Sequence, residues 1–452
     1  MRDVISKVKI LFYAVIVFLI AQVLQLNPAV PLLLVVLAIY SQYAYGNLKN
    51  RSYNLLNLTF LFVLIFSLGY IIIKQHLSIF LIPYALVPML AVMLFDNLEI
   101  SIILTLAISF CLASIAGNNY FVAVLSLISG ILSCLLVKNA RRRSVVIRSG
   151  VIIGLVQMLV LFLIERFKIN NSMNYVDLFA VSVISSFIIV GILPIFEYLF
   201  KTVTNISLLE LADFNNPLLQ RMIMEAPGTY HHSLIVGNLS DAACKAIGAH
   251  ELLARIGAYY HDIGKLSKPE YFSENIDHSQ SKHEALTPAM SKMVIMNHVK
   301  EGIELAKKYR LKPSIVDFIQ QHHGSSLVYY FYRRALENME PDQEVEEEGF
   351  RYPGPKPDTK ETAIVLLADS VEAAARSLQE PNPQKIEELV HKIINNKFID
   401  GQLDECELTL KDLEKISEVF IRILSGVYHS RITYPESSNN NHTNSNKNSE
   451  IN

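Results

Sequence analysis

Apolar residues dominate the first two hundred positions of this chain and thin out sharply after them. Between residues 10 and 200 Leu, Ile, Val, Phe and Ala form almost continuous runs, whereas residues 201–433 carry most of the charge. A helix that crosses a hydrocarbon layer of roughly 30 Å needs about 20 mainly apolar residues, with about 17 as the lower limit. Residues 1–200 therefore predict a transmembrane helical domain of about eight spans. The expected spans are 10–26, 29–45, 53–73, 77–95, 98–116, 119–137, 146–165 and 176–199.

Basic residues beside the expected spans indicate the orientation of this domain. Eight spans place both chain ends on one side of the membrane, and Lys and Arg gather in cytoplasmic loops. Only Lys74, Arg166 and Lys168 fall on the opposite side. We therefore expect a multi-pass protein of the cell membrane whose charged second half is cytoplasmic. The basic residues on the cytoplasmic side are Arg2, Lys7, Lys9, Lys49, Arg51, Lys138, Arg141, Arg142, Arg143, Arg148 and Lys201.

The second half shows the apolar spacing of helices, and the alternation typical of strands is scarce. Apolar residues recur at helical spacing after His231, for example at Leu234 and Leu239, and Gly248 is a suitable stop. We expect an all-α protein in which a transmembrane bundle is followed by a cytoplasmic all-helical domain at residues 228–433. Further helices are expected at 252–262, 288–309, 314–323, 360–378, 383–396 and 410–428.

Three segments outside these helices have a distinct composition. Residues 201–227 include the amphipathic stretch Ser207–Asp213 and predict a linker helix between the two halves. Residues 337–358 are acidic and then rich in Pro and Gly, which indicates a long ordered loop or lid. The Asn- and Ser-rich residues 434–452 cannot bury enough apolar surface to offset their ordering entropy, so we expect a disordered tail.

Charge and cysteine content exclude several classes of function. The formal net charge is −2 and the second half has no basic stripe, so polymeric nucleic acid is not an expected partner. The four cysteines are widely spaced and offer neither a disulfide framework nor a paired metal clamp. The spans lack the paired charges at midplane depth that transporters use. Any bound metal must therefore be held by His and carboxylate side chains.

Histidines are clustered in the second half of the chain. Nine of the thirteen lie between His231 and His323. Imidazole is the commonest protein ligand for metals, and carboxylate beside it favours Fe, Mn or Zn over metals that prefer thiolate. The ligand candidates lie on expected helices or at helix ends, where rigid backbone can hold a coordination geometry. They are His232, His261, Asp262, His298, His322, His323 and Asp369.

The expected helices can deliver these candidates to one point in the core. Asp369 lies in the otherwise apolar run 363–375, where an unpaired carboxylate is costly to bury and a cation would remove that cost. Asp262 can bridge two metals through its two oxygens. Two ions about 3.5–4 Å apart would clamp the attacking and leaving oxygens of a displacement at phosphorus. The pattern therefore predicts phosphoester hydrolysis by metal-activated water.

Other polar residues near these positions have competing explanations. His231 points about 100° away from the neighbouring candidate on a helix, which favours a structural role. His298 taken alone is typical of an exposed helical histidine, but its spacing to His322 favours a ligand. Lys265 is either a solvated loop residue or a point charge that meets a substrate phosphate. We take Asp262 and Lys265 as the candidate catalytic residues.

Long stretches around the candidates, together with the histidine spacing, carry a family resemblance. They are Glu225–Ser233, Tyr259–Lys265, Gln321–Gly324, Phe350–Pro357 and Leu367–Ser370. They resemble the HD-domain phosphohydrolases, and more closely the 7TM-HD family of membrane-bound cyclic-di-AMP phosphodiesterases. The resemblance covers roughly residues 50–430.

That resemblance implies an enzyme with two divalent metal ions, which are iron or manganese in this family. The implied reaction opens cyclic-di-AMP to the linear dinucleotide pApA, and no residue acts as a covalent nucleophile. The implied partners are a cyclic dinucleotide substrate and membrane lipid, and a homodimer is left open. One metal would be held by His232, His261, Asp262 and Asp369, and the other by Asp262, His298, His322 and His323.

Departures from the family and two alternative functions stay open. Family members commonly carry a large extracellular domain after the first helix, whereas only Asn27–Pro28 separates the first two expected spans here. The loop Asn275–His283 also differs from the family pattern, which leaves the role of His283 undefined. One alternative is cyclic-di-GMP cleavage, but the Gly-Tyr-Pro segment of those phosphodiesterases does not follow His323. The other is a membrane receptor whose HD domain binds nucleotide without cleaving it, and the filled ligand positions argue against it.

Overall fold

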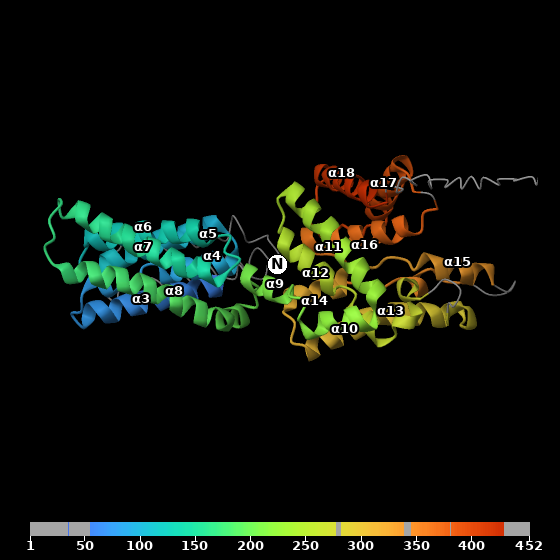
Figure 1. Cartoon of the computed structure of the whole chain (residues 1–452), viewed down its shortest axis with the longest axis horizontal. Coiled ribbons are helices and arrows are strands. Elements are labelled where there is room, and N and C mark those ends of the chain that lie inside the picture. The colour runs from blue at the N-terminus through green and yellow to red at the C-terminus, as the bar shows by residue number, and fades with distance from the viewer. Residues whose placement is uncertain (1–34, 36–54, 277–281, 339–344, 380, 429–452) are drawn as a thin grey trace, which may run out of the picture.

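The protein consists of two helical halves that lie end to end along its long axis (Figure 1). The computed structural model describes residues 35, 55–276, 282–338, 345–379 and 381–428. The expected spans 10–26 and 29–45, apart from residue 35, and the expected tail 434–452 lie outside the described residues.

The N-terminal half is a bundle of apolar helices. Five of them are long and apolar enough to cross a membrane. Many large apolar side chains on their outer faces are exposed, such as Phe187 at 56% and Leu155 at 54%, as expected where lipid replaces water. The chain is therefore a membrane protein. The five helices are α3 (Leu55–Lys74), α5 (Leu98–Ile115), α6 (Tyr120–Val137), α7 (Arg143–Ile164) and α8 (Ser172–Phe200).

The expected span 77–95 is not a continuous helix, and that part of the prediction was wrong. A 3₁₀ turn at Ile79–Leu81 is followed by extended Ile82 and by the short helix α4 (Leu86–Phe95). Pro83 accounts for the break, because proline has no N–H to donate and disfavours helical backbone at the residue before it. All residues of α4 are buried among neighbouring helices. Broken backbone at membrane depth is tolerated only when it is shielded in this way.

Two short helices replace the single linker helix that we expected at residues 201–227. They are α9 (Asn205–Leu211) and α10 (Pro217–Glu225). The chain turns between them because Asp213 accepts hydrogen bonds from Asn215, and Asn216 caps α10 with Pro217 in its first turn. Apolar residues of α9 and α10 share one buried cluster with residues of the C-terminal half. The linker is therefore packed into that half.

The C-terminal half is all helical, as predicted; its described residues contain no strand, only an isolated antiparallel bridge between Leu327 and Arg351. The central helix is α16, whose run 362–369 is completely buried. Side-chain caps and proline in the first turn start most of the helices. The helices are α11 (Pro227–Ile247), α12 (Glu251–Tyr260), α13 (Pro288–Lys308), α14 (Pro313–Gln321), α15 (Tyr329–Glu337), α16 (Lys360–Arg376), α17 (Pro383–Ile399) and α18 (Leu410–Val427).

Gly264 determines how closely α12 and α13 approach each other. It lies in the 3₁₀ turn Ile263–Ser267, just after α12, and a Cβ at this position would come within 1.8 Å of the carbonyl oxygen of His298. Only glycine allows the turn to lie directly on the backbone of α13. The close approach brings the end of α12, with Asp262, against the face of α13 that carries His298.

Candidate metal centre

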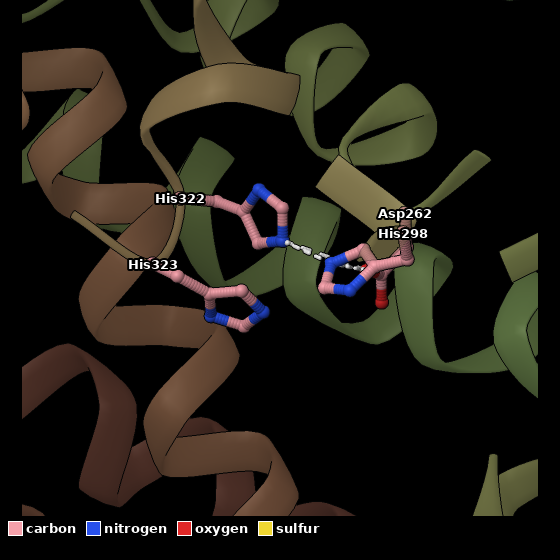
Figure 2. Close-up of side chains that lie close together, drawn as sticks. All are labelled: Asp262, His298, His322 and His323. Carbon is pink, nitrogen blue, oxygen red and sulfur yellow. Dashed lines mark hydrogen bonds and ion pairs between the residues drawn. The ribbon is translucent and has the colours of Figure 1, made fainter. Parts of the chain in front are cut away.

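The seven ligand candidates come from five helices or helix ends and meet in the interior of the C-terminal half. Two neighbouring groups could each hold a metal ion, with all ligand atoms within 4.8 Å of one another inside each group. Figure 2 shows the larger group, in which the side chains of His298, His322 and His323 gather near Asp262. The groups are Asp262, His298, His322 and His323, and His232, His261 and Asp369.

Asp262 belongs to the larger group, and it presents one oxygen to the imidazoles of each group. Its Oδ1 is 3.3 Å from His298 Nε2 and 3.5 Å from His322 Nε2. Its Oδ2 is 3.2 Å from His261 Nε2 and 3.6 Å from His232 Nε2. A carboxylate with this arrangement can bridge two cations.

Asp369 provides a second link between the groups. Its Oδ1 is 3.1 Å from His232 Nε2 and 3.9 Å from His261 Nε2, and its Oδ2 is 3.5 Å from His323 Nδ1. Since α16 is the central helix of this half, the carboxylate of Asp369 is carried on its most deeply packed element. Asp369 is thus buried, as the sequence predicts, and its carboxylate has imidazole neighbours.

Hydrogen bonds at the far side of each ring aim the imidazoles inward. The Nδ1 atoms of His261, His298 and His322 donate to backbone carbonyl oxygens three or four residues earlier in the chain. The Nδ1 of His232 instead faces the carboxylate of Glu372, which is 1% exposed. For His261, His298 and His322 the Nε2 lone pair is left for the interior, which is the tautomer that metal ligation requires.

The donor atoms of the site fit a cation. His261 Nε2 and Asp262 Oδ1 are buried and make no hydrogen bond, and Asp262 Oδ2 is buried with the ammonium of Lys265 2.7 Å away. The Nε2 atoms of His298 and His322 face each other at 3.1 Å while both Nδ1 atoms donate to carbonyls. Orphaned acceptors and opposed lone pairs are costly in an interior, and a divalent cation satisfies them together. The combination of imidazole and carboxylate suits Mn, Fe or Zn.

Both aspartates of the centre are held in the ionised form. Burial alone would raise the pKa of Asp262, but His261 and Lys265 hold that pKa well below its usual range. Burial likewise opposes ionisation of Asp369, and its hydrogen bond with His232 lowers the pKa below its usual range. Two anionic carboxylates are therefore available to a cation at neutral pH.

Three of the imidazoles fall into two electrostatic classes. Burial lowers the pKa of His298 to about 4 and also lowers the pKa of His323, so these rings are neutral and ready to ligate. Burial also opposes the charging of His232, but Asp369 and Glu372 outweigh it and raise the pKa of His232 to about 10. A cation that binds there must therefore displace one proton.

Lys265 lies in the site, although its ammonium already contacts carboxylates. Its Nζ is 2.7 Å from Asp262 Oδ2 and 2.7 Å from Glu274 Oε1, and it lies over the ring of Phe272. Burial would lower the pKa of Lys265, but the two carboxylates raise it. The lysine is charged and orients the bridging aspartate from the side of the site cavity.

A cavity of about 680 Å³ opens onto the centre and exposes four ligand candidates, His232, His298, His323 and Asp369. Its walls combine basic and aromatic side chains, which is the chemistry that would contact the phosphates and bases of a nucleotide. The basic residues are Lys265, Arg334 and Arg376, and the aromatic residues are Tyr271, Phe272, Tyr330, Phe331 and Tyr352.

Several of these residues were not foreseen from the sequence. Glu372 lies three residues after Asp369 in an apolar helix, and this i, i+3 spacing could have identified it as a partner on the same face. Tyr352 packs against His323 with the ring centroids 4.3 Å apart and the rings tilted by 31°, and no sequence signal predicted this contact. His231 is exposed, outside both ligand groups, and His283 lines the cavity with its Nε2 2.9 Å from the carbonyl oxygen of Tyr271.

Comparison with known families agrees with the geometry. Residues 229–374 match the HD domain, so the C-terminal half contains an HD domain. Residues 20–204 match the family described as "7TM receptor with intracellular HD hydrolase". With both regions in this order, the chain belongs to the family of 7TM proteins that carry an HD hydrolase domain, and the resemblance seen in its motifs is confirmed.

Curated relatives extend beyond this chain. It is 44% identical over 325 residues to cyclic-di-AMP phosphodiesterase PgpH of Bacillus subtilis, covering 70% of this chain and 45% of that protein. It is 39% identical over 364 residues to PgpH of Listeria monocytogenes, covering 79% and 50%. The chain thus spans about half the length of these relatives. The crystal structure of the L. monocytogenes PgpH HD domain with cyclic-di-AMP is 46% identical, with a TM-score of 0.46, and covers 48% of this chain and all of that one.

Proposed function

We propose that this protein is a metal-dependent phosphodiesterase that hydrolyses cyclic-di-AMP to pApA. The observation that carries the proposal is the bridging position of Asp262, whose two oxygens face two separate sets of imidazoles. The two PgpH relatives, which bear the name of this activity, support the choice of substrate.

The residues of the centre would hold two divalent cations, manganese or iron. His232, His261, Asp262 and Asp369 would hold one, and Asp262, His298, His322 and His323 the other. Bound there, the cations would supply activation of water and neutralisation of phosphate charge. Asp262 is the ligand shared by both positions, so its loss should affect both.

The protein's own side chains would position the dinucleotide in the site cavity. Arg376 and Arg334 line the cavity and offer charge-assisted hydrogen bonds to phosphate oxygens. Lys265 keeps Asp262 in place and adds positive charge near the reacting phosphorus. Tyr330 is exposed and Phe331 is buried at the cavity wall, and Tyr330 offers a face on which an adenine can stack.

We further propose that the HD domain faces the cytoplasm. One end of the bundle contacts the HD domain, and α6 and α8 end there while α7 begins there (Figure 1). At this end Arg141 pairs with Glu251 at 3.0 Å, and Arg143 pairs with Glu210 at 2.6 Å. Lys and Arg are therefore concentrated at the HD side of the bundle, which is the pattern of a cytoplasmic surface.

Activity of the full chain, purified in detergent with Mn²⁺ under reducing conditions, tests the proposal. We expect conversion of cyclic-di-AMP to pApA, faster than conversion of cyclic-di-GMP in a competition assay. Asp262→Ala and His261→Ala should abolish turnover, and the exposed His231→Ala is the matched control. Absence of turnover by metal-loaded protein with either Mn²⁺ or Fe²⁺ would contradict the proposal.

A further inference from the structure

A second cavity, of about 880 Å³, lies where the membrane bundle meets the HD domain. We call it the junction cavity. Its membrane wall comes from the end of α4, the loop between α6 and α7, and the segment from α8 to α9. Its opposite wall comes from the connection between α11 and α12 and the starts of α14 and α16. None of the seven metal-ligand candidates lines it.

The carboxylates in the junction cavity all have partners. Asp96 Oδ2 is 3.4 Å from His250 Nε2, and Glu251 pairs with Arg141 at 3.0 Å. Glu361 accepts a hydrogen bond of 2.9 Å from the backbone N–H of His250. These acids therefore cannot fully compensate other positive charge in the lining.

Three lysines in the lining make no close ion pair, although Lys138 lies near enough to Asp96 to interact with it electrostatically. Lys138 follows α6, Lys201 ends α8, and Lys245 lies in the last turn of α11; none of them forms an ion pair with any residue that the structure describes. Lys360, the fourth lysine of the lining, is paired with Asp412 at 3.1 Å. Two walls from different halves of the protein thus present unpaired ammonium groups to one cavity.

A buried hydroxyl adds an independent sign that a ligand belongs here. Thr202 lines the junction cavity, is 5% exposed, and its Oγ1 makes no hydrogen bond. An unsatisfied buried hydroxyl is destabilising, and an acceptor oxygen that reached it from the cavity would remove that cost. A phosphate group provides both an acceptor oxygen and a negative charge to pair with the lysines.

We propose that the junction cavity binds a phosphate-bearing anion and that this anion ties the HD domain to the membrane bundle. Lys138 and Lys201 lie at the ends of apolar helices, at the level where hydrocarbon gives way to lipid headgroups. Anionic phospholipid headgroups and free phosphoanions share this chemistry. With its charge shared between Lys201 of the bundle and Lys245 of the HD domain, the ligand bridges the two halves. The proposal is independent of what the metal centre hydrolyses.

The test compares the full chain with the triple variant K138A/K201A/K245A. In the lipid arm, each protein is placed in phosphatidylcholine nanodiscs with increasing phosphatidylglycerol, and native mass spectrometry counts retained phosphatidylglycerol. In the free-anion arm, detergent-purified protein is titrated with pyrophosphate and Tm is measured. Electrostatic attraction per lysine near a membrane surface predicts about 100-fold weaker binding in the triple variant. T202V should weaken binding about 3- to 10-fold without a change of charge.

A control triple variant separates a site from general charge. K392A/K411A/K415A removes the same charge from α17 and α18, outside the cavity lining, and should bind as the wild type does. Selective loss in the lipid arm assigns the site to a headgroup, and selective loss in the pyrophosphate arm assigns it to a free phosphoanion. Equal binding of both probes by the two triple variants overturns the proposal. If K138A/K201A/K245A does not fold, K245E at an exposed position serves in its place, with the same criteria.

Discussion

Replacement of Glu372 isolates the effect of one hydrogen bond on the metal centre. Glu372 is 1% exposed, does not line the site cavity, and contacts His232 Nδ1 from the side opposite the centre. Loss of such a partner typically weakens metal affinity 10- to 100-fold. Gln keeps an acceptor oxygen but removes the charge, so we expect about 10-fold weaker Mn²⁺ binding in E372Q. Ala removes both, so E372A should lose about 100-fold.

Metal titration of the full chain measures the effect. Protein freed of metal with a chelator is titrated with Mn²⁺ by calorimetry and, in parallel, by recovery of phosphodiesterase activity. We expect the activation midpoint to shift upward in the order wild type, E372Q, E372A. The value of kcat at saturating Mn²⁺ should change far less, because Glu372 does not line the cavity that receives substrate.

The matched control is Glu387→Ala, an exposed glutamate on α17. It removes the same charge from the domain and should leave the Mn²⁺ midpoint unchanged. An unchanged midpoint in folded E372A would refute the reasoning that Glu372 holds His232 in the ligating tautomer. Equal shifts in E372A and E387A would point to net charge instead.

Four further outcomes are expected. Metal affinity should rise about tenfold per pH unit between about pH 7 and 9, because a cation must displace the proton of His232. That proton is held because Asp369 and Glu372 overcome burial and raise the pKa of His232 to about 10. A pH-independent Mn²⁺ affinity would contradict this. D262N should lose most Mn²⁺ binding, measured by metal analysis after gel filtration, and retention of two equivalents would disprove bridging. G264A should lower unfolding free energy by about 1–3 kcal/mol in denaturant titration, since its Cβ would collide with a carbonyl of α13. If Lys265 acts mainly on Asp262, K265M should lower kcat and change the KM for cyclic-di-AMP much less. A change in KM alone would instead assign Lys265 to substrate binding.

Helix positions in the HD domain were predicted closely from the sequence, because they depend on local patterns. The expected helices 288–309, 314–323 and 410–428 match α13, α14 and α18 to within two residues at each end. Threonine caps mark the starts of α13 and α18 in the chain itself, and α13 also has proline in its first turn. By contrast, α15 is only nine residues long and has no side-chain cap at its start, and it was missed.

Predictions failed where a local pattern had to compete with backbone chemistry or with packing. The apolar run 77–95 has the composition of a span, but Pro83 interrupts its hydrogen bonding and buried neighbours shield the break. Residues 201–227 have the amphipathic pattern of a helix, but Asp213 and Asn216 divide them into α9 and α10. In both segments one or two residues outweighed a hydrophobic pattern averaged over a longer window.

By itself the sequence determined the chemistry available to this protein: an apolar half long enough to cross a membrane, and imidazoles and carboxylates on predictable helices. These properties follow from residue type and from spacing along one helix. Only the tertiary structure decided that Oδ1 and Oδ2 of Asp262 face different imidazoles, that Glu372 holds His232, and that Lys138, Lys201 and Lys245 share a cavity. Such relations join residues far apart in the chain, and they depend on how closely helices pack. The distance between packed helices is set by side-chain volume and by single positions such as Gly264. The periodic pattern of apolar residues does not reveal such positions.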